Sequence, residues 1–345
     1  MELFGIAQHP WMWQIFLLVA LALAILAMVN HAAARTAERQ NPPKGSFIEV
    51  DGVRLHYSDR GTGRPVVLIH GNLVTGDDYN TSGVAERLLG TCRVILFDRP
   101  GYGYSGRPRW RPWGPMGQAE LLHKALGELG VEQPVLVGHS WGSLVALAYA
   151  IRHRSDTAGL VLLSGYYFPT FRLDALMVAP VAVPVLGDIL RYTVSPIFGW
   201  MTMPITKRMM FAPKPVTARF HAEYCAAMAL RPFQIRATCV DGALMVPATM
   251  KLCTHYGELP LPVTIMAGDG DQVVSHRMAE RLHSAVPGST LRIVQGAGHM
   301  LHHVASERVA DAILAMVKAS PNRHVVVQRD QSRPPCDPHA SCGRA

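Results

Sequence analysis

Short, continuously apolar segments alternate with segments of helical periodicity along most of this 345-residue chain. Strands that are apolar at every position are typical of a parallel sheet covered on both faces, and the helical segments supply the crossover connections. The sequence therefore predicts an α/β fold with a mostly parallel twisted sheet and helices on both faces. Strands are expected at 66–69, 94–97, 135–137, 160–163, 263–266 and 291–294, and helices at about 83–90, 117–129, 141–152, 276–285 and 305–318, after an opening hairpin within 47–57.

The alternation stops between residues 166 and 257, where Met, Pro and Ala are frequent and no strand pattern occurs. Because this segment stands between two predicted core strands, we interpret it as an inserted, largely helical cap. It divides the core into a first part, 46–165, and a second part, 258–319. The apolar run 173–190 within it contains two prolines and two aspartates, which argue against a membrane span.

The chain begins with an apolar run from Trp11 to Val29, close to the ~20 residues that cross a bilayer as a helix. We predict a single-pass membrane anchor over 1–34 and a linker over 35–45. Basic residues follow the run rather than precede it, which favours a main domain on the cytoplasmic side. A cleaved signal peptide stays open, because Ala32-Ala33-Ala34 offers a cleavage site, and it would make the protein secreted or periplasmic.

Charge and composition narrow the possible partners. The net charge is +8, but Lys and Arg are not clustered with aromatic residues as in nucleic-acid binders. In 166–257 nine Lys and Arg face four Asp and Glu, which indicates either a solvated surface or contact with an anionic membrane. The six cysteines form no C-x-x-C pair and have no zinc-ligand spacing. Residues 320–345 lose all periodicity and are predicted to be a disordered tail.

The segment Gly138-His139-Ser140-Trp141-Gly142 follows the predicted strand 135–137 and begins the helix 141–152. A sharp turn at this place holds the serine in a strained conformation, so its neighbours two residues away must lack bulk. The turn also exposes the hydroxyl at the positive end of the helix. Ser140 is therefore the candidate nucleophile.

A serine hydroxyl needs a base that takes its proton, and the base needs an acid that orients it. Among sixteen histidines, His299 is singled out because Gly296-Ala297-Gly298 places it on a loop directly after the last predicted strand. That loop lies at the carboxyl edge of the sheet, as Ser140 does. Asp269 and Asp271 both follow the strand 263–266, and either is a candidate acid.

A tetrahedral oxyanion needs two hydrogen-bond donors. The backbone N–H of Trp141, directly after the nucleophile, is the first candidate. The second is the backbone N–H of Asn72, because Gly71 lets the loop after the strand 66–69 turn into the site. Four further histidines near these motifs are interpreted as structural: His70, His139, His302 and His303.

These motifs, together with Asp98-Arg99-Pro100-Gly101-Tyr102-Gly103-Tyr104-Ser105, resemble those of the α/β-hydrolase superfamily, in the branch with an inserted cap. The resemblance spans residues 46–318. It implies that 98–105 is a structural loop, and it favours Asp271 over Asp269, since the family's acid usually stands three residues after a glycine such as Gly268. The serine separates this chain from related dehalogenases and epoxide hydrolases, whose nucleophile is an aspartate.

The resemblance implies a serine hydrolase, esterase-like or lipase-like, that forms an acyl-enzyme on Ser140 without a metal or organic cofactor. Carbon–carbon bond hydrolysis, acyl transfer and cofactor-free perhydrolysis use the same triad and remain alternatives, as does a non-catalytic ligand-binding receptor. The many apolar cap residues, methionines above all, predict a small apolar substrate. The expected partners are this substrate and, through the N-terminal helix, the lipid bilayer; no nucleic acid is expected.

Overall fold

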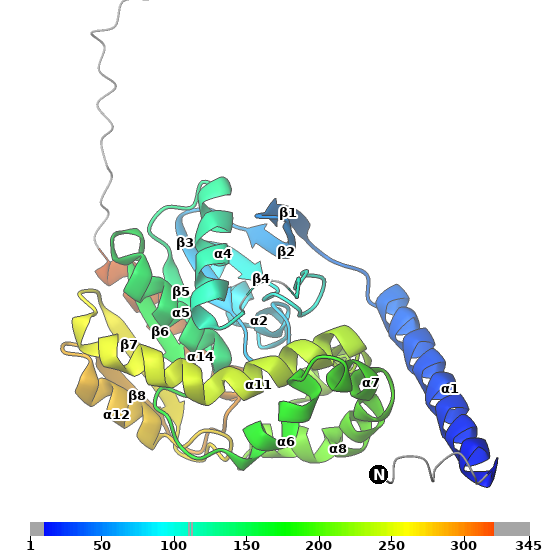
Figure 1. Ribbon diagram of the computed structural model, residues 1–345. Coiled ribbons are helices and arrows are strands. Elements are labelled where there is room, and N and C mark those ends of the chain that lie inside the picture. The colour runs from blue at the N-terminus through cyan, green and yellow to red at the C-terminus, as the bar shows by residue number, and fades with distance from the viewer. Residues whose placement is uncertain (1–9, 110, 112, 321–345) are drawn as a thin grey trace, which may run out of the picture.

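The computed structural model describes residues 10–109, 111 and 113–320 (Figure 1). An eight-stranded sheet in the order β1-β2-β4-β3-β5-β6-β7-β8 forms its centre. The pairs β1–β2 and β2–β4 are antiparallel and all other pairs are parallel, so the predicted mostly parallel sheet and opening hairpin are confirmed. The strands are β1 (Ser46–Val50), β2 (Val53–Arg60), β3 (Arg64–Ile69), β4 (Cys92–Phe97), β5 (Val135–His139), β6 (Gly159–Leu163), β7 (Val263–Gly268) and β8 (Thr290–Val294).

Alternate residues of the central strands enter two separate hydrophobic cores, one on each face of the sheet. In β3, Val67 and Ile69 belong to one core, whereas Val66 and Leu68 belong to the core on the other face. Every position of such a strand must therefore be apolar. The first core is covered by α4 (Pro115–Glu128), α5 (Trp141–Arg152) and α12 (Arg277–Ala285), and the second by α3 (Val84–Leu88) and α14 (Ser306–Ala319).

The segment between β6 and β7 is helical, and no strand occurs within 166–257, all of which the structure describes. Its longest helix, α11 (Pro232–Leu252), packs against α5 and lies across the core in Figure 1. The elements are α6 (Leu173–Ala182), α7 (Leu186–Tyr192), α8 (Val194–Phe211), α9 (Ala218–Glu223), α10 (Ala226–Ala229), α11 (Pro232–Leu252) and a 3₁₀ helix, η3 (Cys253–Glu258).

The apolar run 173–190 does not form one straight helix. Helices α6 and α7 meet at an angle of 98°, with Pro184 between them. Proline has no N–H to continue the helix, so the break falls where its ring stands. Beyond the break, Asp188 accepts a hydrogen bond of 2.6 Å from Arg109 of the core, so an ion pair joins α7 to the core.

Helix α1 (Pro10–Gln40) is longer than the sequence suggested. It has a mean hydropathy of 2.5 in its most apolar window, which makes it long and apolar enough to cross a membrane, as a signal sequence also would be. The helix continues through residues 35–40 of the predicted linker, because Ala, Arg and Glu there are strong helix formers. Only 41–45 connects it to β1.

The predicted tail, 320–345, lies outside the described residues except for Ser320. That serine is buried, and its hydroxyl donates a hydrogen bond of 3.1 Å to the carbonyl of Ala158. The core therefore extends one residue beyond its predicted end at 319. The remaining short elements of the described residues are α2 (Asp78–Thr81), a 3₁₀ helix, η2 (Arg154–Asp156), and α13 (Leu301–Val304).

Candidate active site

Ser140 stands between β5 and α5 with φ of +52° and ψ of −117°, a conformation that residues with a side chain rarely adopt. The glycines on both sides are sterically required. A Cβ at Gly142 would lie 2.1 Å from the carbonyl oxygen of Ile69, and one at Gly138 would lie 2.5 Å from that of Gly142. The turn is therefore strained and packed against β3, and it places the Ser140 hydroxyl at the start of α5.

Three side chains predicted from the sequence meet at this turn. His299 Nε2 lies 3.0 Å from Ser140 Oγ, and His299 Nδ1 lies 2.9 Å from Asp271 Oδ2. With Nδ1–H donating to the carboxylate, Nε2 carries the lone pair that faces the hydroxyl. The Asp271 side chain is completely buried and that of His299 almost so. Both distances suit proton transfer from Ser140 to His299.

The two candidate aspartates have different partners. Asp271 directs Oδ2 to His299, while its Oδ1 accepts the backbone N–H groups of Val273 and Val274, both at 2.8 Å. Asp269 instead accepts the backbone N–H of Gly296 at 2.6 Å. Asp269 therefore fastens the loop that carries His299, and only Asp271 contacts the imidazole.

The two candidate oxyanion donors belong to Trp141 and Asn72, which directly follow Ser140 and Gly71 in the chain. Trp141 is the first residue of α5, where a backbone N–H has no acceptor within the helix. Asn72 follows Gly71, whose Cβ, if present, would lie 3.1 Å from the Cβ of Ser140. The loop after β3 thus approaches the nucleophile as closely as a backbone without a side chain can.

Sequence reasoning missed the residue that holds this loop, Arg99. Its guanidinium donates to the carbonyls of His70 (2.8 Å) and Gly71 (3.1 Å) and to the side chain of Asn72 (2.8 Å). The remaining donors reach Gln118 (3.0 Å) and Asp241 (2.6 Å). All five N–H donors of a buried arginine are thereby used. A buried positive charge cannot be inferred from sequence when its partners lie on distant segments.

His70 completes the support of the same loop. Because the backbone N–H of Arg99 donates to His70 Nε2 (2.9 Å), the ring proton is on Nδ1, which donates to the Gly71 carbonyl (2.7 Å). Burial, reinforced by the charge of Arg99, lowers the pKa of His70 to about 3. His70 is therefore neutral, in agreement with its interpretation as a structural residue.

Asp241 joins the helical segment to the core. This residue of α11 is fully buried and binds both Arg99 (2.6 Å) and Arg107 (2.8 Å), and it accepts the Tyr102 hydroxyl at 3.1 Å. Removal of one member of such a group leaves an uncompensated buried charge. The 98–105 loop is thus structural, as the resemblance implied, and its arginine also positions the candidate oxyanion loop.

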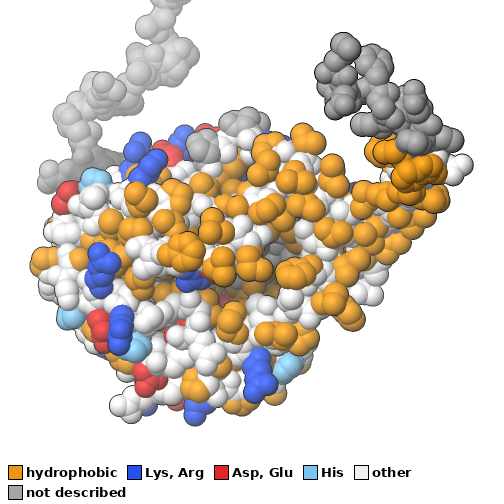
Figure 2. Space-filling model, turned by 60° about the horizontal axis from the view of Figure 1, so that its bottom comes forward, with side chains coloured by type: hydrophobic (Ala, Val, Ile, Leu, Met, Phe, Trp, Pro, Cys, Tyr) orange, Lys and Arg blue, Asp and Glu red, His pale blue; other side chains and the backbone are white. Residues whose placement is uncertain are grey.

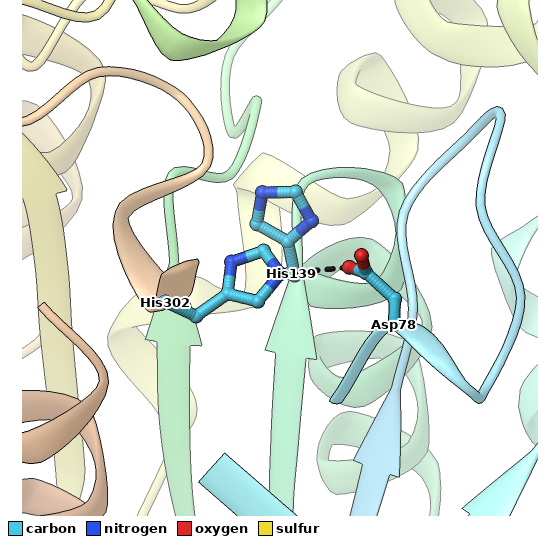
Figure 3. A group of neighbouring side chains, drawn as sticks. All are labelled: Asp78, His139 and His302. Carbon is cyan, nitrogen blue, oxygen red and sulfur yellow. Dashed lines mark hydrogen bonds and ion pairs between the residues drawn. The ribbon is translucent and has the colours of Figure 1, made fainter. Parts of the chain in front are cut away.

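A buried group next to the loop of His299 is drawn in Figure 3, in which Asp78, His139 and His302 converge from α2, β5 and α13. His302 donates to Asp78 at 2.7 Å, and His303 donates to its other oxygen at 2.8 Å. His139 Nε2 donates to the backbone carbonyl of His299 at 3.1 Å. Since both carboxylate oxygens already accept N–H groups, we interpret these residues as a hydrogen-bonded support of the His299 loop.

Electrostatics agree with this interpretation. Although burial raises the pKa of the Asp78 carboxyl, the charges and hydrogen bonds of His303 and His302 outweigh it and hold the pKa well below its usual range. Burial, with the neighbouring His302 and His299, lowers the pKa of His139 far below its ordinary value. His139 is therefore neutral and donates only one hydrogen bond, to the loop that carries the base.

The helical segment 166–257 directly contacts the loop that carries His299. The backbone N–H of Met300 donates to the carbonyl of Met210 at 3.1 Å. A Cβ at Gly298 would lie 2.2 Å from the carbonyl of Ala212. The end of α8 therefore packs on the residues before and after His299, and this contact requires the glycine that precedes the histidine.

A cavity of about 280 Å³ lies elsewhere, between the residues that follow α1, strand β2 and helices α9 and α10. Its walls include His56, Tyr104 and Tyr224 but neither Ser140 nor His299. We do not place a substrate in this cavity, because none of the three triad side chains lines it.

Comparisons with known proteins agree with this geometry. A family model for the alpha/beta hydrolase fold matches residues 64–306. The 2-hydroxymuconate semialdehyde hydrolase of Pseudomonas putida is 38% identical over 138 residues, which are 39% of this chain and 48% of that protein.

Among solved structures, a thermophilic esterase from Thermogutta terrifontis has a TM-score of 0.64 at 22% identity and covers 79% of this chain and 98% of its own. A bacterial membrane phospholipase A has a TM-score of 0.59 at 21% identity and covers 90% of this chain and 99% of its own. At these identities the structures show a shared fold, and the family match indicates a hydrolase. The chain therefore belongs to the α/β-hydrolase family.

Proposed function

We propose that this protein is a serine hydrolase that cleaves an apolar, ester-type substrate through an acyl-enzyme. The observation that carries the proposal is the continuous hydrogen-bonded series from Ser140 through His299 to the buried carboxylate of Asp271. A binding module without chemistry would not need a strained serine, a base at 3.0 Å and an orienting acid together. This argues against the alternative of a non-catalytic receptor.

The chemistry proceeds in two displacements. His299 Nε2 takes the proton of Ser140 as Oγ attacks the ester carbonyl, and the resulting oxyanion accepts hydrogen bonds from the N–H groups of Trp141 and Asn72. The protonated His299 then donates its proton to the leaving alcohol. A water molecule attacks the acyl-enzyme with His299 again as base, and the acid product leaves with Ser140 restored. Each step needs only the residues described here.

The apolar nature of the substrate is supported by the composition of the helical segment, which we propose acts as a cap. Most apolar side chains of this segment face outward, although a cap over an apolar substrate would be expected to direct them toward the core. Among those in α6–α8, Met203, Met210 and Phe211 are buried, whereas Met177, Trp200 and Met201 are exposed. The buried group reaches the His299 loop, where it suits a flexible aliphatic chain.

We further propose that α1 is an uncleaved membrane anchor with the catalytic domain on the cytoplasmic side. Ala32-Ala33-Ala34, the sequence of the alternative cleavage site, lies inside a continuous helix. Contacts flank it on both sides, from Asn30 to Tyr192 and from Glu38 to Arg231. Signal cleavage there would remove the first of these contacts.

Carbon–carbon bond hydrolysis is the second candidate. The partial identity with the 2-hydroxymuconate semialdehyde hydrolase supports it, and the same three residues are compatible with it. Ester cleavage remains our first choice because it needs nothing beyond the nucleophile, base and oxyanion donors already present.

A screen of p-nitrophenyl esters of graded acyl length tests the proposal, with a vinylogous diketone as the carbon–carbon substrate. We expect kcat/KM to rise from acetate toward medium chains, because each buried methylene adds up to ~0.8 kcal/mol of binding. Ser140→Ala should lose about 10⁴-fold or more. A preference for acetate or for charged, sugar-like esters would refute the apolar substrate. Faster cleavage of the diketone than of every ester would favour the second candidate.

A further inference from the structure

The outer face of α6, α7 and α8 carries an unusual number of exposed large apolar side chains. Phe171, just before α6, is 84% exposed, and Trp200 and Val185 are both 71% exposed. A soluble monomer rarely leaves such residues side by side in water. Figure 2 shows apolar side chains spread over this face and continuing onto α1. The two apolar surfaces therefore belong to one side of the molecule.

Helix α1 determines at which depth this face would lie relative to a membrane. Its apolar run ends at Val29, and 19 residues of helix span about 28 Å, close to the thickness of the hydrocarbon layer. The next residue, Asn30, donates its amide hydrogens to the carbonyls of Tyr192 (2.8 Å) and Thr193 (2.7 Å). The junction of α7 and α8 is thus fixed where the anchor leaves the bilayer.

Further contacts stop α1 from swinging away. Arg231 of the helical segment binds Glu38 at 3.0 Å, and the Tyr104 hydroxyl of the core donates to the carbonyl of the same residue at 3.3 Å. Ala37, one turn from Asn41, is buried. Figure 1 shows α6 and α8 on the side of the domain toward the N-terminal end of α1, that is, toward the hydrocarbon layer. The anchor therefore sets the orientation of the domain as well as its location.

The corner between α6 and α7 supports the same conclusion. Val185 has φ of +67°, a conformation that a β-branched residue adopts only under strain. Glycine would relieve this strain, yet the position presents an isopropyl group to the outside. A strained residue that serves no internal packing indicates a role at the surface.

We propose that the α6–α8 face is seated in the same bilayer leaflet from which α1 emerges, so that the domain lies partly submerged and draws its apolar substrate from the lipid. Interfacial helices bury their apolar side ~5–10 Å into the boundary of the acyl chains. Helix α8 then connects the two regions, since its exposed Trp200 faces the lipid and its end at Phe211 packs beside the His299 loop. The proposal of lipid-borne substrate rests on the proposed function; the seating of the face does not.

The excess of Lys and Arg in 166–257 contributes less to the seating of this face than the composition alone would suggest. Of the nine basic residues in 166–257, Arg172, Arg191, Arg219 and Arg231 already form ion pairs with carboxylates. We therefore expect the seating to depend on apolar burial and to persist in neutral phosphatidylcholine.

Photocrosslinking of the full-length protein in phosphatidylcholine vesicles tests the seating. p-Benzoylphenylalanine would replace Trp200 in one variant and Met250 in a control; Met250 is also exposed but stands near the far end of α11. We expect lipid adducts at position 200 at least tenfold above those at position 250. Equal yields at the two positions, or crosslinks from position 200 only to a second copy of the chain, would overturn the proposal.

A second experiment separates seating from folding. Val185→Asn should leave the melting temperature nearly unchanged, because the Val185 side chain is 71% exposed and belongs to none of the hydrophobic cores. It should lower kcat/KM roughly tenfold for a long-chain ester embedded in vesicles, the loss expected when one buried valine side chain is removed from lipid. The rate at which Val185→Asn hydrolyses a short ester in solution should stay within twofold of the wild-type rate. The control variant Met250→Asn should stay within twofold of wild type with both substrates.

An unchanged vesicle rate for Val185→Asn would contradict the role of the face in substrate entry. If neither substrate is hydrolysed by the wild type, the proposed function fails while the crosslinking result still decides the seating.

Discussion

Replacement of Asp271 by Asn exchanges one carboxylate oxygen for an amide nitrogen, and the structure determines which one. Oδ1 accepts two backbone N–H groups at 2.8 Å, from Val273 and Val274, so an amide must keep its oxygen there. The NH₂ group then takes the place of Oδ2, 2.9 Å from His299 Nδ1. Two donors cannot face each other, so His299 moves its proton to Nε2 and can no longer accept the proton of Ser140.

This wrong tautomer costs about 10⁴-fold in kcat in a related triad. We expect a loss of that order in kcat/KM for Asp271→Asn, measured with the best p-nitrophenyl ester. Asp269→Asn is the matched control. Its Oδ1 can still accept the N–H of Gly296, so the loss should stay within about tenfold.

A finer comparison uses Asp271→Ala, which removes the acid without forcing a tautomer. Asp271→Ala should therefore be no slower than Asp271→Asn. If Asp269→Asn is the more damaging of the two asparagine variants, or if Asp271→Asn loses less than tenfold, the orientation of His299 by Asp271 is wrong.

Three other predictions concern the support of the site. Arg99→Lys keeps the charge but only three of five donors, so the loop of Asn72 should shift and kcat should fall about 10- to 100-fold with KM little changed; wild-type kcat would contradict the positioning role. Ser140→Gly should be about 1 kcal/mol more stable than Ser140→Ala in urea unfolding, since glycine adopts φ of +52° without strain, and equal stabilities would argue against a strained turn. Burial lowers the pKa of His70 in the folded state to about 3, whereas the unfolded chain binds this proton below its own pKa of about 6.5, so the free energy of unfolding should fall as pH drops. This group should account for about 2 kcal/mol between pH 6.5 and 4.5, and a pH-independent stability in that window would contradict its burial as a neutral ring.

Features that depend on neighbouring residues could be predicted from the sequence. The strands were recognisable because both faces of the sheet are covered, which makes residues such as Val66 and Val67 equally apolar. The turn at Ser140 was recognisable because its two glycines are sterically required within five residues. Local sterics therefore predicted the fold and the position of the candidate nucleophile.

Features that depend on direction or on distant partners could not be predicted. Residue spacing alone did not separate Asp269 from Asp271, because the two differ in where their side chains point rather than in their distance from β7. The contact of Arg99 with Asp241 joins residues 142 positions apart, and neither lies in a motif that requires the other. The sequence shows that apolar residues are frequent in α6–α8, but only the structure separates those that face the core from those that face outward.

The length of α1 shows a different limit. The composition predicts an anchor that ends at residue 34 and a linker from 35 to 45, but a helix ends where its backbone hydrogen bonds end rather than where its apolar residues end. The Ala-rich and charged residues up to Gln40 continue it and supply Ala37 and Glu38, which attach it to the domain.

The central claim is that Ser140 is a nucleophile activated by His299, and covalent labelling tests it most directly. The full-length protein would be treated with an alkyl fluorophosphonate, and the modified peptide identified by mass spectrometry. We predict one phosphonylated residue, Ser140, with labelling lost in Ser140→Ala and slowed at least 100-fold in His299→Ala. Labelling at another serine, or equal labelling rates with and without the imidazole, would contradict the account.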